Sequence, residues 1–173
     1  MFLRQPFNPF QPFPPFFPFH PFKLLITFYS MPSLIPEAGN HQNLLCYQKA
    51  KLVYAFNNWF IEHTDLRFKR TQEQMEHAAR SGKQNIVEGL NNYATSKASG
   101  IHLINVARGS LKELKEDYED FLIRHALKQW PYTDRLFKRA QELGKTHNNE
   151  PDFFIKKFET LSPEMIANII IVR

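Results

Sequence analysis

Apolar residues recur at helical spacing over residues 43–63. Leu45, Leu52 and Phe56 follow one another at steps of seven and four. This spacing places their side chains on one face of a helix. We therefore predict a first helix over residues 43–63, followed by a polar turn over residues 64–70.

A second helix is predicted to begin at Thr71, because Gln74 stands three residues later and completes a capping box. Its apolar and small residues alternate steps of four and three, which is typical of the seam of a helical bundle. Glycines on such a seam allow a neighbouring backbone to come close. We therefore predict that Gly82 and Gly89 mark close helix packing. The seam consists of Met75, Ala79, Gly82, Ile86, Gly89 and Tyr93.

The same spacing returns in a third helix, predicted over residues 97–125. At 1.5 Å per residue, such a helix is about 43 Å long. Its second half is rich in acidic residues and carries oppositely charged pairs four positions apart, which is typical of a solvated face. The apolar positions of this helix are Ile104, Ala107, Leu111, Leu114, Tyr118 and Phe121.

Turn-forming residues divide the remainder of the chain. Gly144 is predicted to end a short helix over residues 133–143, and residues 148–152 are predicted to form a loop. Ser162 and Pro163 are typical of an N-cap and a first helical position, so a last, apolar helix is predicted to begin there. No alternating segment is long enough to indicate a sheet, and the predicted fold class is all-α.

The beginning of the chain differs in composition from the rest. Residues 1–30 hold nine of the 17 Phe and seven of the 12 Pro, with no acidic residue. Such frequent proline prevents both helix and sheet, because each proline fixes φ and removes a backbone donor. We interpret residues 1–35 as a Phe/Pro-rich disordered segment and residues 36–173 as the folded domain. Three explanations of the segment stay open: translation that begins at Met31, a disordered tail, or a polyproline ligand.

Charge and cysteine content exclude several classes of protein. The formal net charge is +5, and it falls to +3 without Arg4 and Lys23, the two cations of the first 30 residues. This charge is too weak to indicate a nucleic-acid-binding protein by itself. The single cysteine, Cys46, excludes an intramolecular disulfide framework. Because no run of 18 apolar residues is present, we expect a cytoplasmic protein without a membrane span.

No catalytic or metal site is predicted, and we expect no cofactor. The stretch EQMEH contains Glu73, Glu76 and His77, but a di-metal bundle needs Glu-x-x-His motifs on two helices. Cations near the first turn and along the second helix are candidates for contacts with nucleic-acid phosphates. These candidates are Arg67, Lys69, Arg70, Arg80, Lys83 and Lys97.

Polar residues beside the seam form a second candidate set. Asn85 and Glu88 flank Ile86 and Gly89, so we expect both to be partly buried and to have hydrogen-bond partners. One interpretation is an interhelical polar network that fixes the register of the helices. The other interpretation is a pocket for a ligand or a nucleic acid. The predicted network consists of Asn85, Glu88, Arg108 and Ser110.

Four stretches carry a resemblance to a known family. They are YQKA in the first helix, QMEHAARSGKQNIVEG in the second, and TSK and VARGSLKELKEDYEDFL at and within the third. They resemble the bacterial four-helix-bundle proteins called 23S rRNA intervening-sequence proteins, and most closely the branch named for a four-helix-bundle suffix domain. The resemblance covers residues 36–130 well and residues 131–173 loosely. It implies an antiparallel up-down four-helix bundle that often assembles into a five-fold ring.

The resemblance also implies a longer last helix than this chain has, so we expect a shortened last helix and a truncated C-terminus. A sibling group of the family is basic and works with a reverse transcriptase and nucleic acid. We therefore predict a non-enzymatic, self-associating helical-bundle protein that serves as a binding or scaffold module. A homo-oligomer, with a pentamer as the implied form, and RNA or a nucleic-acid enzyme are its expected partners. The alternative is a purely structural or vestigial bundle whose only partner is itself.

Overall fold

The computed structural model describes residues 41–172, and all of their regular structure is helical. The all-α fold class is therefore confirmed for this part of the chain. The predicted Phe/Pro-rich segment, residues 1–35, lies outside the described residues. None of the described helices is both long and apolar enough to cross a membrane. The elements are η1 (His41–Asn43), α2 (Leu45–His63), α3 (Lys69–Tyr93), α4 (Lys97–Arg124), α5 (Arg135–Thr146), α6 (Pro151–Phe158) and α7 (Pro163–Val172).

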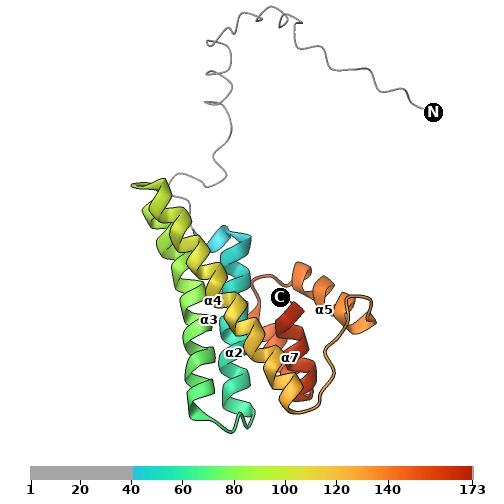
Figure 1. Cartoon of the computed structure of the whole chain (residues 1–173). Coiled ribbons are helices and arrows are strands. Elements are labelled where there is room, and N and C mark those ends of the chain that lie inside the picture. Colours follow the sequence, from blue (N-terminus) through green and yellow to red (C-terminus); the bar gives the residue numbers. More distant parts are fainter. Residues whose placement is uncertain (1–40, 173) are drawn as a thin grey trace, which may run out of the picture. The chain divides into compact units, whose positions relative to one another are not determined.

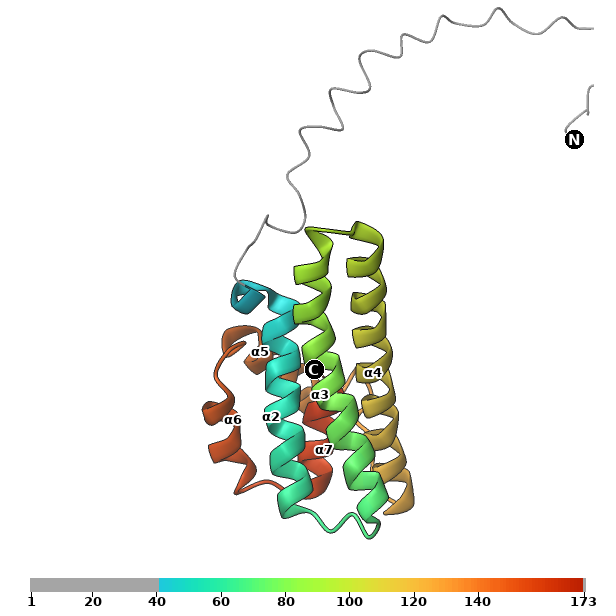
Figure 2. The same cartoon turned by 90° about the vertical axis from the view of Figure 1, so that its left-hand side faces the viewer.

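The three long helices α2, α3 and α4 run antiparallel in succession and form a helical bundle (Figures 1 and 2). The most extensive contact in the described part of the chain is between α3 and α4. The short helix α7 packs against both α4 and α2, whereas α6 packs against α2 and α5 against α7. The two helices α5 and α6 thus connect α4 to α7 along the outside of the bundle.

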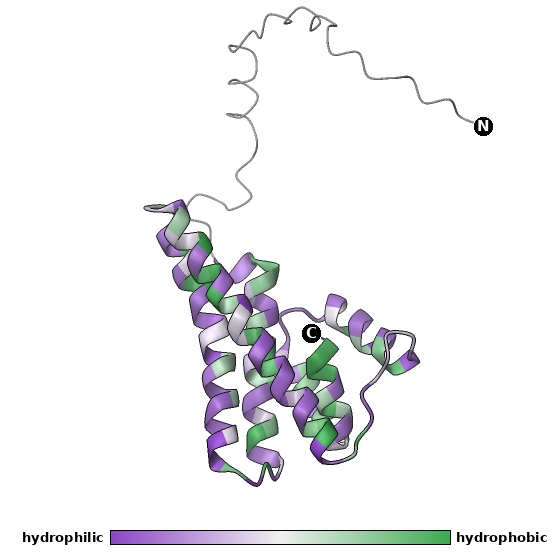
Figure 3. Cartoon of the chain, viewed as in Figure 1, coloured by the Kyte–Doolittle hydropathy of each residue, from purple (hydrophilic) through white to green (hydrophobic). Residues whose placement is uncertain are grey.

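The core lies where α2, α3, α4 and the last two helices meet. Its largest fully buried side chains include Phe56 and Phe60 of α2, Tyr118 of α4 and Phe158 of α6. The predicted seam of α3 is confirmed as a buried face, because five of its six residues are buried and only Tyr93 is partly exposed. The C-terminal part of α7 is hydrophobic, while many residues on the outer sides of α3 and α4 are hydrophilic (Figure 3). Leu45 departs from the predicted apolar face of the first helix, since it is the first residue of α2 and is 56% exposed.

Glycine allows the close approach of α3 and α4. A Cβ atom added to Gly82 would lie 2.6 Å from side-chain atoms of Leu111. One added to Gly89 would lie 3.0 Å from the carbonyl oxygen of Gly100, and one added to Gly100 would lie 2.7 Å from that of Gly89. The structure therefore places both predicted glycines at the α3–α4 contact. A third glycine, Gly100 of α4, was not predicted. At this residue the backbone of α4 lies directly against the backbone of α3.

The predicted capping box at Thr71 is wrong. The N-cap residue of α3 is Phe68, which makes no side-chain capping hydrogen bond. The carbonyl oxygen of Phe68 accepts hydrogen bonds from the N–H groups of Thr71 and Gln72 at 3.0 and 3.3 Å. The helix has therefore begun before Thr71, and Thr71 occupies an ordinary position in its first turn.

Two predictions for the region after α4 are also wrong. Helix α5 passes through Gly144 and continues to Thr146, because Gly144 is buried against the fold and does not end the helix in a left-handed conformation. Part of the predicted loop over residues 148–152 begins α6, with Pro151 at its start. Proline fits the first turn of a helix because the missing N–H has no intrahelical partner there. Phe154 and Phe158 of α6 each pack edge-on against a phenylalanine of α2.

A buried asparagine attaches the segment after α4 to α7. The Asn168 side chain is 1% exposed. Its Nδ2 donates to the carbonyl oxygens of Lys128 and Glu164, both at 2.9 Å, and its Oδ1 accepts from the N–H of Trp130 at 2.7 Å. Every polar atom of this side chain is therefore satisfied, and α7 is held in a defined position beside α4.

The end of α4 places an alanine in an unfavourable backbone conformation. Ala126 has φ of 53°, in the left-handed region that favours glycine. The N–H of Leu127 donates to Leu122 at 2.8 Å, and the N–H of Ala126 donates to Ile123 at 3.1 Å. This is the hydrogen-bond pattern of a Schellman motif, in which a glycine usually takes the position of Ala126.

Replacing Gly100 and Gly109 of the same helix by alanine should have opposite effects. Gly100→Ala should lower the free energy of unfolding by about 1–3 kcal/mol, because the new methyl group meets backbone atoms of α3. Gly109→Ala should raise it by about 0.5–1 kcal/mol, because nothing lies within 4 Å of the new methyl group and alanine favours helix. Urea unfolding followed by circular dichroism measures both changes. Equal effects of the two substitutions would contradict the close approach at Gly100.

Ala126→Gly should stabilise the protein by up to about 1 kcal/mol, because glycine adopts a positive φ without steric cost. The matched control is Ala98→Gly, an exposed position within α4, which should destabilise by up to about 1 kcal/mol. The same urea unfolding experiment compares them. A loss of stability in Ala126→Gly as large as that in the control would show that the helix end has a different conformation.

Candidate functional site

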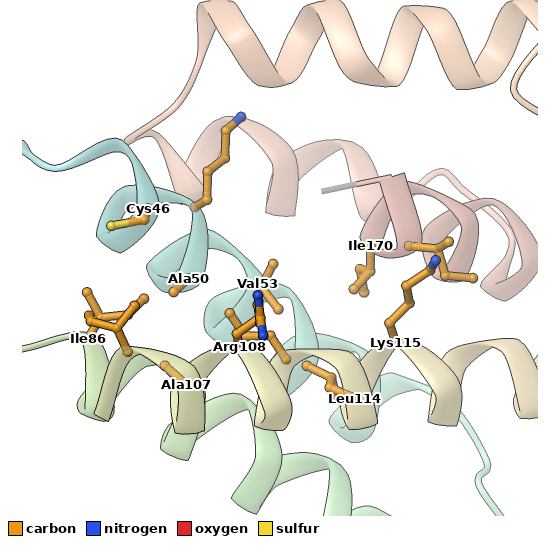
Figure 4. Close-up of a pocket in the computed structure, with 13 residues that line it drawn as sticks. Cys46, Ala50, Val53, Ile86, Ala107, Arg108, Leu114, Lys115 and Ile170 are labelled. Atoms are coloured by element: carbon orange, nitrogen blue, oxygen red, sulfur yellow. The ribbon is translucent and has the colours of Figure 1, made fainter. Parts of the chain in front are cut away.

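An apolar groove of about 350 Å³ lies between α2 and α4, next to the C-terminal part of α7. One wall is formed by residues of α2, the other by residues of α4, and Ile170 and Ile171 of α7 stand at one end. Figure 4 shows Cys46, Ala50 and Val53 on the α2 side and Ala107, Arg108, Leu114 and Lys115 on the α4 side.

Small residues account for the recess. Ala50 of α2 and Ala107 of α4 are both buried, and they form a small cluster with Ile86 of α3. Two facing methyl groups leave more space between the helices than the phenylalanines that fill the main core. Partly buried side chains, among them Ile104 and Leu111, pack around this cluster and line the groove.

The charged side chains that line the groove are all cationic. They are Lys49 on the α2 side and Arg108 and Lys115 on the α4 side, and no acidic residue lines the groove. The Nζ atom of Lys49 donates to the carbonyl oxygen of Gly144. Lys115 forms an ion pair of 3.5 Å with Glu119. Arg108 is exposed and makes no hydrogen bond or ion pair with any described residue.

The two cations of α4 have a regular spacing along the groove. Arg108 and Lys115 are seven residues apart, which corresponds to two helical turns or about 10.5 Å. They therefore lie on the same side of α4 and face the groove from one rim. Lys49 faces it from the other rim, on α2. The groove thus combines an apolar floor with positive charge on both sides.

The six cations predicted to contact phosphates do not form one surface. Arg67, Lys69 and Arg70 lie at the N-terminal end of α3, whereas Lys97 begins α4 beyond the C-terminal end of α3. Helix α3 has 25 residues and is therefore about 37 Å long. The cations at the start of α3 are therefore about 37 Å from Lys97.

Several of these cations have partners within the fold. Lys69 forms an exposed ion pair of 3.9 Å with Glu73. The Nζ atom of Lys83 lies 3.8 Å from the centre of the Tyr54 ring, in a cation–π contact between α3 and α2. Arg70 lines a recess together with acidic residues of α3 and α4. Arg80 is exposed on α3.

The predicted polar network is present only in part. The Oγ atoms of Ser81 and Ser110 are 3.1 Å apart and join α3 to α4, and Nδ2 of Asn85 donates to the Ser81 Oγ at 2.9 Å. Ser81, which the sequence analysis did not include, is therefore the link between Asn85 and Ser110. Glu88 is exposed, contrary to the expected partial burial, because it lies on the side of α3 away from the seam. Arg108 lines the apolar groove instead.

A recess between α3 and α4 gathers negative charge around one half-buried carboxylate. Burial raises the pKa of Asp117, and the charges of Asp120 and Glu113 raise it further, while Arg124 lowers it. The acidic residues that line this recess are Glu73, Glu113, Glu116, Asp117 and Asp120. No group of three or more His, Cys, Asp or Glu side chains in the described part of the chain could hold a metal ion.

Beneath this recess, a buried tyrosine joins α4 to α2. The Tyr118 hydroxyl donates to Oδ1 of Asn57 at 2.8 Å, and both side chains are completely buried. Burial raises the pKa of Tyr118 well above its usual value, and the charge of Asp117 adds to the shift. This tyrosine is therefore a neutral hydrogen-bond donor of the core.

Comparison of the chain with protein-family models, with curated proteins and with solved structures gives no match. The shape and charge of the groove are therefore the features from which a function can be inferred.

Asp117→Asn should stabilise the protein at neutral pH. A carboxyl group whose pKa is raised on folding contributes stability at low pH and loses that contribution as the pH rises. The variant should therefore unfold at a higher temperature than the natural chain at pH 7. The difference should shrink as the pH falls through the raised pKa of Asp117 and should vanish below pH 3.8, the usual pKa of aspartate. Thermal unfolding between pH 3 and pH 7 measures it.

The matched control is Glu142→Gln, because Glu142 is exposed, lies outside the recess and forms an ion pair with Lys145 at 2.7 Å. Loss of that pair should leave the unfolding temperature unchanged or slightly lower. A lower unfolding temperature of Asp117→Asn at pH 7 would contradict the direction of the pKa shift.

Proposed function

We propose that this protein is a non-enzymatic helical-bundle binding and scaffold protein that binds a helix of another polypeptide in the apolar groove. The observation that carries the proposal is the groove itself, with its apolar lining between α2, α4 and α7. Apolar surface recessed between helices and rimmed by polar residues is typical of a helix-binding site.

The arrangement of the helices supports a helix as the occupant. The contacts α2–α3, α3–α4, α4–α7 and α7–α2 close a ring of four neighbours. We interpret this as an antiparallel up-down four-helix bundle in which α7 is a shortened fourth helix. Helix α7 has 10 residues and is about 15 Å long, whereas α4 has 28 and is about 42 Å long. The groove lies between α2 and α4, beside the last described turn of α7.

The resemblance to the 23S rRNA intervening-sequence proteins supports a scaffold role, because it implies a four-helix bundle that often assembles into a five-fold ring. Self-association of this chain, as expected from the sequence, would be one use of the groove. Association with RNA receives less support, because the six predicted phosphate-binding cations are spread over about 37 Å and several have partners within the fold.

A synthetic amphipathic helix of about 18 residues, with a leucine stripe flanked by glutamine, should bind the full-length protein. Ile104→Glu should weaken this binding at least about tenfold, because it puts a carboxylate against the apolar lining. Fluorescence anisotropy of the labelled peptide measures the affinity. Cys46, the single cysteine, lines the groove, so its reaction with a thiol reagent should slow when the peptide is bound.

The matched control is Ile101→Glu, because Ile101 lies one turn before Ile104 on α4, is 55% exposed and does not line the groove. It should bind the peptide as the natural chain does. Circular dichroism establishes that both variants are folded. If the peptide does not bind, or if binding leaves the reaction of Cys46 unchanged, the purely structural bundle is the better description.

A further inference from the structure

We infer that the natural occupant of the groove is an amphipathic helix of a different protein, with acidic residues on both sides of its apolar stripe. This inference rests on the proposed function and adds the chemistry of the partner. It is carried by the charge of the groove, which is positive on both rims and contains no acidic side chain.

The length and spacing of the α4 rim fit a helix of about three turns. The lining residues of α4 extend from Ile104 to Lys115, which is about 16 Å along the helix. An occupant helix of this length presents apolar residues at steps of three and four to the floor. Arg108 and Lys115, two turns apart, face acidic residues of the occupant that are seven positions apart. Lys49 faces an acidic residue on the opposite side of the apolar stripe.

The two cations of α4 can meet carboxylates of the occupant without disrupting the fold. Arg108 is exposed and has no acidic partner among the described residues, so its guanidinium offers a bidentate contact. Lys115 and Glu119 form an ordinary pair on the surface of α4, which contributes little to stability and exchanges easily. The ammonium group of Lys49 donates to the carbonyl oxygen of Gly144 and adds positive charge on the α2 side of the groove.

A second copy of the chain fits the groove less well. Pairing groove to groove around a twofold axis would bring the cations of both copies together, and like charges in an interface are unfavourable. The exposed large apolar side chains of the described residues are spread over α2, α4, α5 and the segments between helices, so the described helices present no continuous apolar stripe to insert. A small ligand with one carboxylate would meet only one rim of the groove.

Two further peptides test the inference. They keep the leucine stripe of the neutral peptide and replace its flanking glutamines by glutamate in one and by lysine in the other. The full-length protein should bind the acidic peptide more tightly than the neutral one and the basic peptide least. The advantage of the acidic peptide should decrease between 50 mM and 500 mM salt, because the ion pairs lie at the rim.

Substitution of the rim cations should remove the charge preference. Arg108→Gln and Lys115→Gln should each weaken binding of the acidic peptide about 1.5- to 5-fold, the range of an exposed ion pair. They should weaken binding of the neutral peptide less than binding of the acidic one, so that the ratio of the two affinities falls toward one. The double variant Arg108→Glu with Lys115→Glu should prefer the basic peptide. The matched control is Lys112→Gln, an exposed cation of α4 outside the groove, which should bind all three peptides as the natural chain does.

The results separate this inference from the proposed function. Equal affinity for all three peptides, with loss of binding in Ile104→Glu, would overturn the acidic partner and leave the helix-binding groove intact. Sedimentation velocity gives a second check. Concentration-dependent association that Ile104→Glu abolishes and that competes with the neutral peptide would show that a second copy occupies the groove, and would also overturn the inference. Failure of all three peptides to bind would reject the proposed function itself.

Discussion

The close approach of α3 and α4 at Gly89 and Gly100 is the constraint on which the rest of the bundle depends. Each backbone leaves no room for a methyl group on the other at this point. Further along the same contact, Leu111 of α4 lies over Gly82 of α3, so glycine on one helix accommodates a large side chain of the other. Ala107, on the same helix as Gly100, faces Ala50 of α2. The space that these two small side chains leave between α2 and α4 is the groove.

Buried polar groups then fix how the remaining helices sit on this pair. The hydrogen bond from the Tyr118 hydroxyl to Oδ1 of Asn57 crosses the core from α4 to α2 and gives both of these buried oxygens a partner. Asn168 acts in the same way between α7 and the segment after α4, where all of its polar atoms are satisfied. Apolar packing alone tolerates sliding of one helix along another. These two asparagines make the register of α2 and α7 specific.

The sequence predicts the long helices well, because a regular seam such as that of α3 produces a strong helical period. Helix α6 was missed because it has eight residues and begins with a proline, which also occurs in loops. The groove could not be predicted for a different reason. Ala107 and Ile104 belong to the apolar period of α4, and that period does not distinguish a core position from an uncovered one. The tertiary arrangement of α2, α4 and α7 makes that distinction.

In the proposed function, Arg108 supplies charge at the edge of an apolar groove. It lines the groove and is exposed, so its aliphatic stem can cover apolar surface while its charged end reaches water. Lys115 repeats this arrangement two turns later. In the free protein, such side chains cover part of the apolar surface and oppose pairing of one groove with another through like charge. In the proposed complex, an acidic helix would turn the same charges from a barrier into a contact, so that one set of residues would exclude the wrong occupant and recognise the right one.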